Sequence, residues 1–462
     1  MVGKHILRQL KKFYSSIWDR IELIKSVLLS LLIILSMFLT WSLWTYTPNI
    51  NVLENQEPFK TAIENGDKKN LGEMIQPKQI ILHKGDKHYW SYFKDQEEVY
   101  KQLQETLLIQ GEEVEYKPST PDEGIEIFYP TEIPGEVLRE TFSFGNGNDN
   151  PFRNSTRNIE KIKVFKEEGI WKVQFIGKDR ENEKQMKSAK VVQFQLPRQS
   201  SNIPNLIDKM IGSENTQEVA LYEIQKKAYY LPVNEMTVQS SIFTSDTVEI
   251  DLFVRALLQE DVAVRKRDDK ILYGDPTSLI TYEEDNETFS YRNLKTQDGG
   301  LQQNAIIQSL DFINRHEGWT DNFNLYHYYD SRLDLDTNNK QKEIRYRMIV
   351  DGFPVMDDPA NNASISEIEI EWTKSQPNKY ERSLRYLKDP YGDFTEKVAS
   401  GNAVIKALER MKVSTITDIT LGYKAVQIDS NFELLPTWYY RGVSSWMEID
   451  FEANEPPIDK GA

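Results

Sequence analysis

The side chains that could bind a metal or transfer a proton near neutral pH are few in this chain. Its five histidines are His5, His83, His88, His316 and His327, and only His83 and His88 lie close together in the sequence. They flank the Lys84-Gly85-Asp86 turn of a predicted hairpin, so a metal there would need further ligands. We therefore predict a structural or surface role for both. The chain has no cysteine, which excludes disulfides and cysteine-ligated metals.

Motif searches also give no catalytic site. H-E-x-x-H, G-x-S-x-G and G-x-x-x-x-G-K-[ST] are all absent from the sequence. The segment DLDTNN resembles the start of a calcium loop, with Asp334, Asp336 and Asn338 at ligand positions. However, Asn339 replaces the expected glycine and Arg345 replaces the bidentate glutamate, so we predict a polar turn. No spacing singles out a catalytic carboxylate pair. The sequence thus predicts no cofactor and no enzymatic activity.

One apolar segment is long enough to cross a membrane. Residues 26–46 (SVLLSLLIILSMFLTWSLWTY) carry no charge, and about 20 apolar residues span a hydrocarbon core. The alternative is a cleaved signal peptide, whose apolar region is shorter and is followed by a small-x-small site. This segment ends instead in Trp41, Trp44 and Tyr46, residue types enriched at membrane interfaces. We predict an uncleaved transmembrane helix.

The charge distribution predicts its orientation. Residues 1–46 carry six Lys/Arg and two acids, a net charge of +4, and the whole chain carries −16, so the remainder carries −20. Positive flanks stay in the cytoplasm, so we predict a cytoplasmic tail at 1–25 and an extracellular body from residue 47. An acidic body argues against nucleic-acid binding. A large exported chain without cysteine fits a Gram-positive bacterium.

One face of this predicted helix could contact another membrane protein. At 100° per residue, seven side chains share a stripe about 120° wide, namely Ser26, Ser30, Ile33, Ser36, Met37, Thr40 and Trp44. Small and hydroxyl residues let a second helix approach closely and hydrogen-bond. Alternatively, the hydroxyls bond the carbonyls four residues earlier in their own helix. The sequence leaves both interpretations open.

The outer body has the alternation of an α+β protein with antiparallel sheets covered by helices. Segments 79–90 and 161–175 predict hairpins, and 94–109 predicts a helix ended by Gly111. A helix followed by an antiparallel meander occurs twice, with helices at 303–316 and 400–411. Composition shifts predict three domains, at residues 47–200, 201–298 and 299–455.

Several motifs together resemble one protein family. Residues 25–49 (KSVLLSLLIILSMFLTWSLWTYTPN) are similar to the opening of YycH-type proteins. Further similar motifs are YYLP (229–232), DGFPVM (351–356), SGNAVIKALE (400–409), LGY (421–423) and LPTWYYRG (435–442). Each is weak alone, but their order together with the membrane segment is more specific. The last three also resemble the related protein YycI.

The resemblance implies a function and a set of partners. Members of this family are membrane-anchored regulators of the WalK/YycG cell-wall sensor histidine kinase in low-GC Gram-positive bacteria. The resemblance implies contacts with that kinase and with a YycI-like partner through transmembrane helices. It also implies that the last two domains of this chain have a YycI-like fold. It implies no catalytic residues, and it leaves open whether the protein forms a homodimer. Two alternatives are a membrane-tethered enzyme and a passive binding module for cell-wall polymer or peptide.

Overall fold

The computed structural model describes Lys25, residues 28–40 and most of residues 62–452. The longer segments outside this description are 146–151, 153–156, 179–189, 198–201, 296–302, 332–340 and 359–363. The chain forms two compact units, Met1–Pro58 and Phe59–Ala462. In the first unit, residues 28–40 are α-helical.

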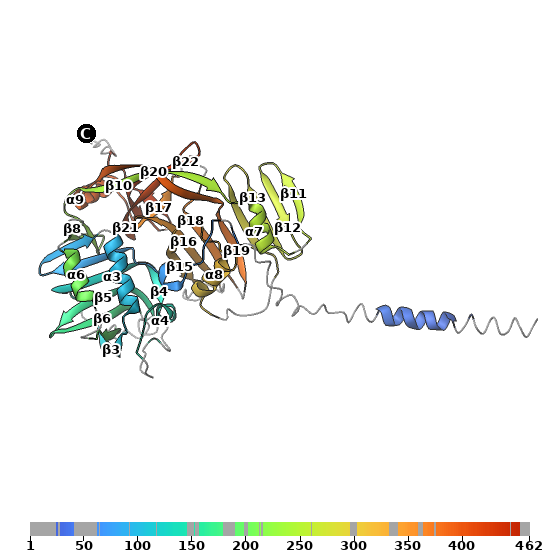
Figure 1. The fold of residues 1–462 in the computed structure, drawn as a ribbon, viewed down its shortest axis with the longest axis horizontal. Coiled ribbons are helices and arrows are strands. Elements are labelled where there is room, and N and C mark those ends of the chain that lie inside the picture. The colour runs from blue at the N-terminus through green and yellow to red at the C-terminus, as the bar shows by residue number, and fades with distance from the viewer. Residues whose placement is uncertain are drawn as a thin grey trace, which may run out of the picture. The chain divides into compact units, whose positions relative to one another are not determined.

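The second unit begins with an antiparallel sheet, shown in blue and green in Figure 1. Its described strands are β1 (Gln79–Lys84), β2 (Lys87–Ser91), β3 (Ile109–Glu115), β4 (Glu123–Pro134), β5 (Asn158–Glu167), β6 (Ile170–Lys178), β7 (Lys190–Gln195), β8 (Thr216–Ile224) and β9 (Lys227–Pro232). Their spatial order is β3-β7-β6-β5-β4-β1-β2-β8-β9. The predicted hairpins at 79–90 and 161–175 are confirmed as β1–β2 and β5–β6. The second turns at Glu168 and Gly169, both with positive φ, as a two-residue hairpin requires.

A larger sheet contains the rest of the described strands. These are β10 (Met236–Thr247), β11 (Ala263–Arg267), β12 (Lys270–Gly274), β13 (Ser278–Glu283), β14 (Thr288–Asn293), β15 (Phe323–Asp330), β16 (Lys342–Val350), β17 (Phe353–Asp357), β18 (Glu367–Trp372), β19 (Pro377–Ser383), β20 (Arg385–Val398), β21 (Asp418–Ile428), β22 (Asn431–Arg441) and β23 (Trp446–Glu448). The order is β11-β12-β13-β14-β19-β18-β16-β17-β21-β22-β10-β20, with β15 on β16 and β23 on β22. The β17–β21 pair is parallel, and the others are antiparallel.

Helices cover these sheets, as the α+β prediction requires. The described helices of this unit are α2 (Leu71–Met74), α3 (Phe93–Glu105), α4 (Gly135–Thr141), α6 (Ile203–Ile211), α7 (Ile250–Leu257), α8 (Ala305–Asn314) and α9 (Gly401–Arg410). Helix α6 packs on α3 and β2, α8 on β16, and α9 on β8. Along the chain, α8 precedes β15–β18 and α9 precedes β21–β23, at the places of the two predicted helices.

The predicted helix at 94–109 is too long. Helix α3 ends at Glu105, and Gly111 lies inside β3 rather than after a helix. The Thr106 hydroxyl donates a hydrogen bond to the Gln102 carbonyl at 2.6 Å. This bond satisfies a carbonyl at the end of the helix. Leu107, inside the predicted helix, is 50% exposed. Apolar spacing alone cannot separate the last helical turn from the start of a strand.

The predicted domain limits at residues 200 and 298 do not coincide with breaks in the sheets. Strands β8 and β9 follow residue 200 and yet extend the first sheet through β2. Strand β10 pairs with β20 and β22, while β14 pairs with β19. The strands of the predicted central domain are thus shared between both sheets. Local composition carries no signal of such distant pairing.

One continuous hydrophobic core runs through both sheets. Helix α9 joins them closely, because a Cβ on Gly401 would lie 2.7 Å from Leu231 Cβ and 2.8 Å from Tyr222 Cε2. Both distances are below normal carbon–carbon contact. Gly401 belongs to the SGNAVIKALE motif, so the motif has a packing reason in this fold.

We expect Gly401→Ala to lower the free energy of unfolding by about 1–3 kcal/mol, because the added methyl forces α9 away from β8 and β9. Urea unfolding of the full chain in detergent, followed by tryptophan fluorescence, measures this. The matched control is Gly274→Ala, whose Cβ would meet Leu279 at an ordinary 3.6 Å. Equal stability of the two variants would contradict the proposed crowding.

Candidate functional site

The predicted transmembrane face lies partly within the described residues. Ser30, Ile33, Ser36, Met37 and Thr40 all lie on the helical stretch 28–40 and are exposed. Ser26 and Trp44, the remaining members of the stripe, lie outside the described residues. Among the residues that the structure describes, no helix is both long enough and apolar enough to cross a membrane.

The hydroxyl of Thr40 donates a hydrogen bond to the Ser36 carbonyl at 2.8 Å. This is the bond to the preceding turn that the sequence left open as an alternative. A hydroxyl already bonded within its own helix offers a lone pair rather than a proton to a neighbouring helix. The contribution of Thr40 to helix association would therefore come from its small size and this acceptor.

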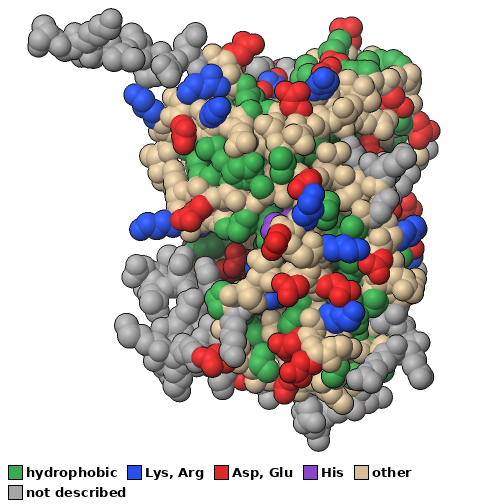
Figure 2. Space-filling model, turned by 90° about the vertical axis from the view of Figure 1, so that its left-hand side faces the viewer, with side chains coloured by type: hydrophobic (Ala, Val, Ile, Leu, Met, Phe, Trp, Pro, Cys, Tyr) green, Lys and Arg blue, Asp and Glu red, His purple; other side chains and the backbone are tan. Residues whose placement is uncertain are grey.

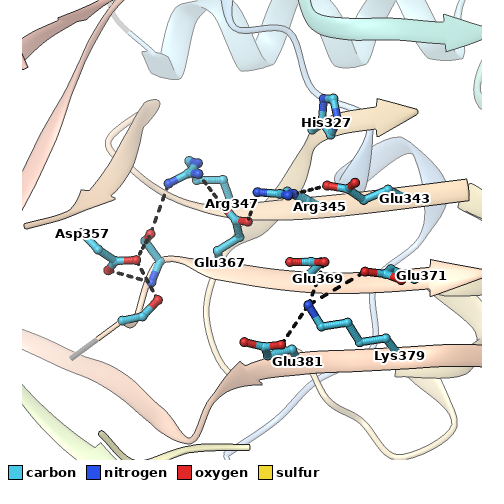
Figure 3. A network of polar contacts seen from close by, with 12 residues as sticks. His327, Glu343, Arg345, Arg347, Asp357, Glu367, Glu369, Glu371, Lys379 and Glu381 are labelled. Carbon is cyan, nitrogen blue, oxygen red and sulfur yellow. Dashed lines mark hydrogen bonds and ion pairs between the residues drawn. The ribbon is translucent and has the colours of Figure 1, made fainter. Parts of the chain in front are cut away.

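A second candidate site is a cavity of about 580 Å³ in the larger sheet, lined in part by strands β15, β16, β18, β21 and β22. We call it the charged cavity. Its lining includes His327 from β15, Arg345 and Arg347 from β16, Glu367 from β18, Lys424 from β21 and Arg441 from β22. These residues come from five strands, so only the folded sheet assembles them. Figure 3 shows His327, Arg345, Arg347 and Glu367 of this set.

Alternation along two strands builds one wall of this cavity. In β16, Ile344, Tyr346 and Met348 are buried on the α8 side, which leaves Arg345 and Arg347 on the opposite face. In β18 the same alternation buries Ile368 and Ile370 and presents Glu367, Glu369 and Glu371. The register places Arg347 opposite Glu367 and Arg345 opposite Glu369. Opposite charges therefore face each other across the two strands.

The ion pairs in this wall are extensive. Arg347 pairs with Glu367, and Arg345 pairs with Glu343 and, at 3.2 Å, with Glu367. Only 12% of the Arg347 side chain is exposed, and its buried Nε has no hydrogen-bond partner among the described residues. A buried donor without a partner carries a desolvation cost. This wall therefore keeps one buried donor without a partner among the described residues.

Lys379 of β19 is the centre of a second group of ion pairs in this wall. Its ammonium lies 2.9 Å from both Glu369 and Glu381 and 3.9 Å from Glu371 (Figure 3). Burial would raise the pKa of Glu369, but Lys379 and Arg345 lower it, so this carboxylate is ionised at neutral pH. The pKa of Glu371 is raised by burial and by the nearby Glu369.

The opposite side of the cavity is aromatic. Tyr326, Met356 and Tyr439 form a separate hydrophobic cluster with Trp446 packed against it. The rings of Tyr326 and Trp446 are 6.0 Å apart, and the Arg347 guanidinium lies 5.1 Å from the Tyr326 ring centre. The charged cavity thus combines an apolar wall with a few converging polar groups, as small-ligand sites do.

The sequence analysis did not identify these residues as a site. The visible signal was the alternation of charged and apolar residues in KEIRYRMIV and EIEIEW. Such a pattern normally indicates a strand with one face in water. The strands β21, β22 and β23 instead contribute the facing residues Lys424, Arg441 and Trp446.

His83 and His88 have the predicted structural role. Their Nδ1 atoms are 2.9 Å apart, and His83 is completely buried. His83 Nε2 lies 3.4 Å from Glu126, within ion-pair distance but without hydrogen-bond geometry. Among the described residues, no group of three or more His, Asp or Glu is placed to hold a metal ion. The DLDTNN segment falls outside the described residues.

A second large cavity, about 590 Å³, lies between the two sheets. Four of the motifs that suggested a family line it, through Tyr229, Phe353, Leu421 and Trp438. The ion pair between Lys78 and Asp418, at 2.6 Å, also joins the sheets here. These motifs are separated by up to about two hundred residues in sequence, so their convergence gives them a shared role in holding the sheets together.

Figure 2 shows acidic and basic side chains interspersed over one face of the molecule, with hydrophobic groups gathered between them. This face has no continuous basic surface of the kind that binds nucleic acids. The observation agrees with the acidic overall charge.

Comparisons with known proteins give a consistent assignment. The family model "YycH protein, N-terminal domain" matches residues 22–191, and "YycH protein, C-terminal domain" matches residues 226–456. A Bacillus subtilis (strain 168) protein named "Two-component system WalR/WalK regulatory protein YycH" is 21% identical over 455 residues, covering 90% of this chain and 94% of that protein.

A solved structure supports the fold. The crystal structure of YycH from Bacillus subtilis superposes with a TM-score of 0.67 at 16% identity, covering 83% of this chain and 98% of that one. The two family models together match more than half of the sequence, in the order in which the motifs occur. This chain therefore belongs to the YycH family.

Proposed function

We infer that this protein is a non-enzymatic accessory regulator of a sensor histidine kinase that controls cell-wall metabolism. The observation that carries this inference is its similarity, over 90% of its length, to a relative named as a regulatory protein of the WalR/WalK two-component system. The absence of a catalytic motif from the sequence is consistent with a role exerted by contact. Its partners would be a WalK/YycG-like kinase and a YycI-like protein. The last two domains of this chain would have a YycI-like fold.

The proposed site of action is the membrane. Residues 26–46 would span it once, with the tail 1–25 in the cytoplasm and the bulk of the chain outside the cell. The support is the uncharged 21-residue segment and its basic flank. The helical conformation of residues 28–40, with exposed apolar side chains, suits this environment.

The mechanism would be a shift in the population of kinase states. Ser30, Ser36 and Thr40 let this helix approach the membrane helices of the kinase closely. The helix would then favour one of their arrangements over another. A coupling of about 1–3 kcal/mol changes the ratio of two states by roughly 5- to 150-fold.

We expect the triple variant Ser30→Leu, Ser36→Leu and Thr40→Leu to move kinase-dependent reporter output toward the level of a strain lacking this protein. Bulky side chains would prevent close approach of the partner helix, while the segment stays apolar enough to insert. A promoter controlled by the cognate response regulator, read in cells with matched protein levels, measures the effect.

The matched control changes the opposite face, with Leu31→Ala and Leu35→Ala, which lie about 180° from the centre of the stripe. These substitutions should leave output near the wild-type level. Unchanged output in the Leu variant would remove the stripe from the mechanism. Replacing residues 26–46 with an unrelated transmembrane helix tests the wider claim that membrane contacts matter.

A second candidate function is a membrane-tethered extracellular binding module. The specific observation in its favour is the charged cavity, with its apolar wall and its partly unsatisfied Arg347. Saturable binding of wall material to the full chain, with no change in kinase output on removing the chain, would favour this role over regulation.

A further inference from the structure

The charged cavity has the dimensions and composition of a ligand site. Its volume, about 580 Å³, lies within the range of about 300–1,000 Å³ that small-molecule sites occupy. Six carboxylates and five Lys/Arg side chains line it. The lining therefore carries one more negative than positive charge, which disfavours a polyanion. A single anionic group can bind only where one cation lacks a carboxylate partner.

Nearly all the charges of the cavity neutralise one another. Arg347 and Arg345 are paired with Glu367, and Lys424 lies 3.0 Å from Glu448 and 3.6 Å from Asp358. The two oxygens of Asp357 accept bonds from the backbone and side chains of residues 364–366. Arg382 donates hydrogen bonds to the carbonyls of Ser383 and Gly318. Apart from the Arg347 Nε atom, these groups are already satisfied by the protein.

Arg441 is different. Among the described residues no carboxylate lies within ion-pair distance of its guanidinium, whose Nη2 lies 3.4 Å from His327 Nδ1. Burial, with Arg441 and Arg345 nearby, lowers the pKa of His327 to about 4, so this ring is neutral at physiological pH. Asp418 lies opposite Arg441 in the β21–β22 register, but it is paired with Lys78 at 2.6 Å. The corner formed by Arg441 and His327 therefore has a positive charge without a direct carboxylate partner.

The aromatic wall lies beside this corner. Tyr439 and Trp446 occupy β22 and β23, the strands that carry and flank Arg441. Together with Tyr326 and Met356 they offer apolar surface within the same cavity. A ligand that satisfies both features carries an anionic group next to an apolar side chain.

We propose that the charged cavity binds the C-terminal carboxylate of a short peptide, with the carboxylate on Arg441 and the last side chain on Tyr326, Tyr439 and Trp446. A planar guanidinium binds a carboxylate through two parallel hydrogen bonds. Glu381 lines the same cavity with its side chain 47% exposed, so it can receive a basic group of the peptide while Lys379 stays paired with Glu369. The proposal is independent of the membrane-helix contacts.

The direct test is calorimetric titration of the full chain in detergent with the peptide Lys-Leu-Phe and with its C-terminal amide. The acid is expected to bind with a dissociation constant of about 1 mM or lower, and the amide about tenfold more weakly, because it cannot pair with Arg441. This comparison uses the wild-type chain, so it does not depend on the folding of a variant.

Variants then locate the site. Arg441→Leu should weaken binding of the acid at least about tenfold and should bind acid and amide alike. Arg441→Lys should retain part of the preference, since it keeps the charge but not the two-pronged geometry. The matched control is Arg267→Leu, which lies on the β11–β12 hairpin and is 82% exposed, and it should bind as the wild type does.

Three outcomes would overturn the proposal. These are equal affinity for acid and amide in the wild type, an unchanged affinity in Arg441→Leu, and no peptide binding at millimolar concentration. Tighter binding of a glycerol-phosphate oligomer than of the peptide would assign the cavity to a phosphate polymer instead, and would likewise overturn it.

Discussion

Replacing Glu126 with alanine is expected to lower the free energy of unfolding by about 3–5 kcal/mol, because it leaves buried partners without their counter-charge. The Glu126 side chain is 5% exposed and is 2.7 Å from the ammonium of Lys161. It accepts a hydrogen bond from the Tyr230 hydroxyl at 3.2 Å and lies 3.4 Å from His83. One carboxylate thus joins strands β1, β4, β5 and β9 of the first sheet.

This carboxylate also gives the prediction a pH signature. Burial alone would raise its pKa, but the contacts with His83 and Lys161 outweigh burial and hold the pKa at about 2. A group whose folded pKa lies below its unfolded value of 4.5 stabilises the fold above that value. Its contribution is lost as the pH falls from about 4.5 to about 2, and the Glu126→Ala variant should lack this limb of the curve.

The control for Glu126 is Glu123→Ala on the same strand. Glu123 pairs with Lys166 at 3.2 Å, but both side chains are more than 40% exposed. An exposed pair contributes about 0–1 kcal/mol, so this variant should unfold close to the wild type. Urea unfolding at pH 7 compares the two. A loss in Glu126→Ala no larger than in Glu123→Ala would show that the buried network does not stabilise the sheet.

The second large effect concerns acid sensitivity. Replacing His316 with glutamine should flatten the fall in stability between about pH 6.5 and 3. His316 is 4% exposed and is surrounded by Phe253, Phe312 and Tyr380. The centres of these three rings lie 5.7–5.8 Å from the centre of its imidazole. Burial, and then the nearby Arg382, lower its pKa to about 3.

The sign follows from proton binding. Between pH 6.5 and 3 the unfolded imidazole binds a proton that the folded one excludes, so stability falls as the pH falls. At about 1.4 kcal/mol per pH unit, the loss by pH 3 reaches roughly 5 kcal/mol. Asp321 acts in the opposite direction, because burial raises its folded pKa to about 6 and it holds a proton that the unfolded chain releases. The difference between wild type and His316→Gln therefore isolates the histidine.

Unfolding free energies measured every half unit of pH, for both proteins, give this difference. Parallel curves below pH 6.5 would contradict the neutral, buried state of His316. Carbon-13 NMR titration of the histidine side chains provides an independent measurement, because the His316 signal should not shift down to about pH 4, whereas the histidines of the unfolded state titrate.

The sequence by itself determined the local elements and the family. Period-two alternation predicted β5–β6 and the C-terminal meanders, and apolar spacing predicted α8 and α9. These patterns are visible because a residue's neighbours within a few positions decide them. The motifs around Tyr229, Phe353 and Trp438 identified the family, and the matches at 22–191 and 226–456 agree.

Only the tertiary structure decided which distant segments meet. β10 pairs with β20 and β22 across more than a hundred residues, and β8 and β9 cross the predicted domain limit. The charged cavity depends on the same pairing, since it brings Arg441 to His327 and Trp446 to Tyr326. Alternating charges in β16 and β18 looked like an ordinary solvated face. Long-range strand pairing is set by the packing of the whole core, and a local pattern carries no record of it.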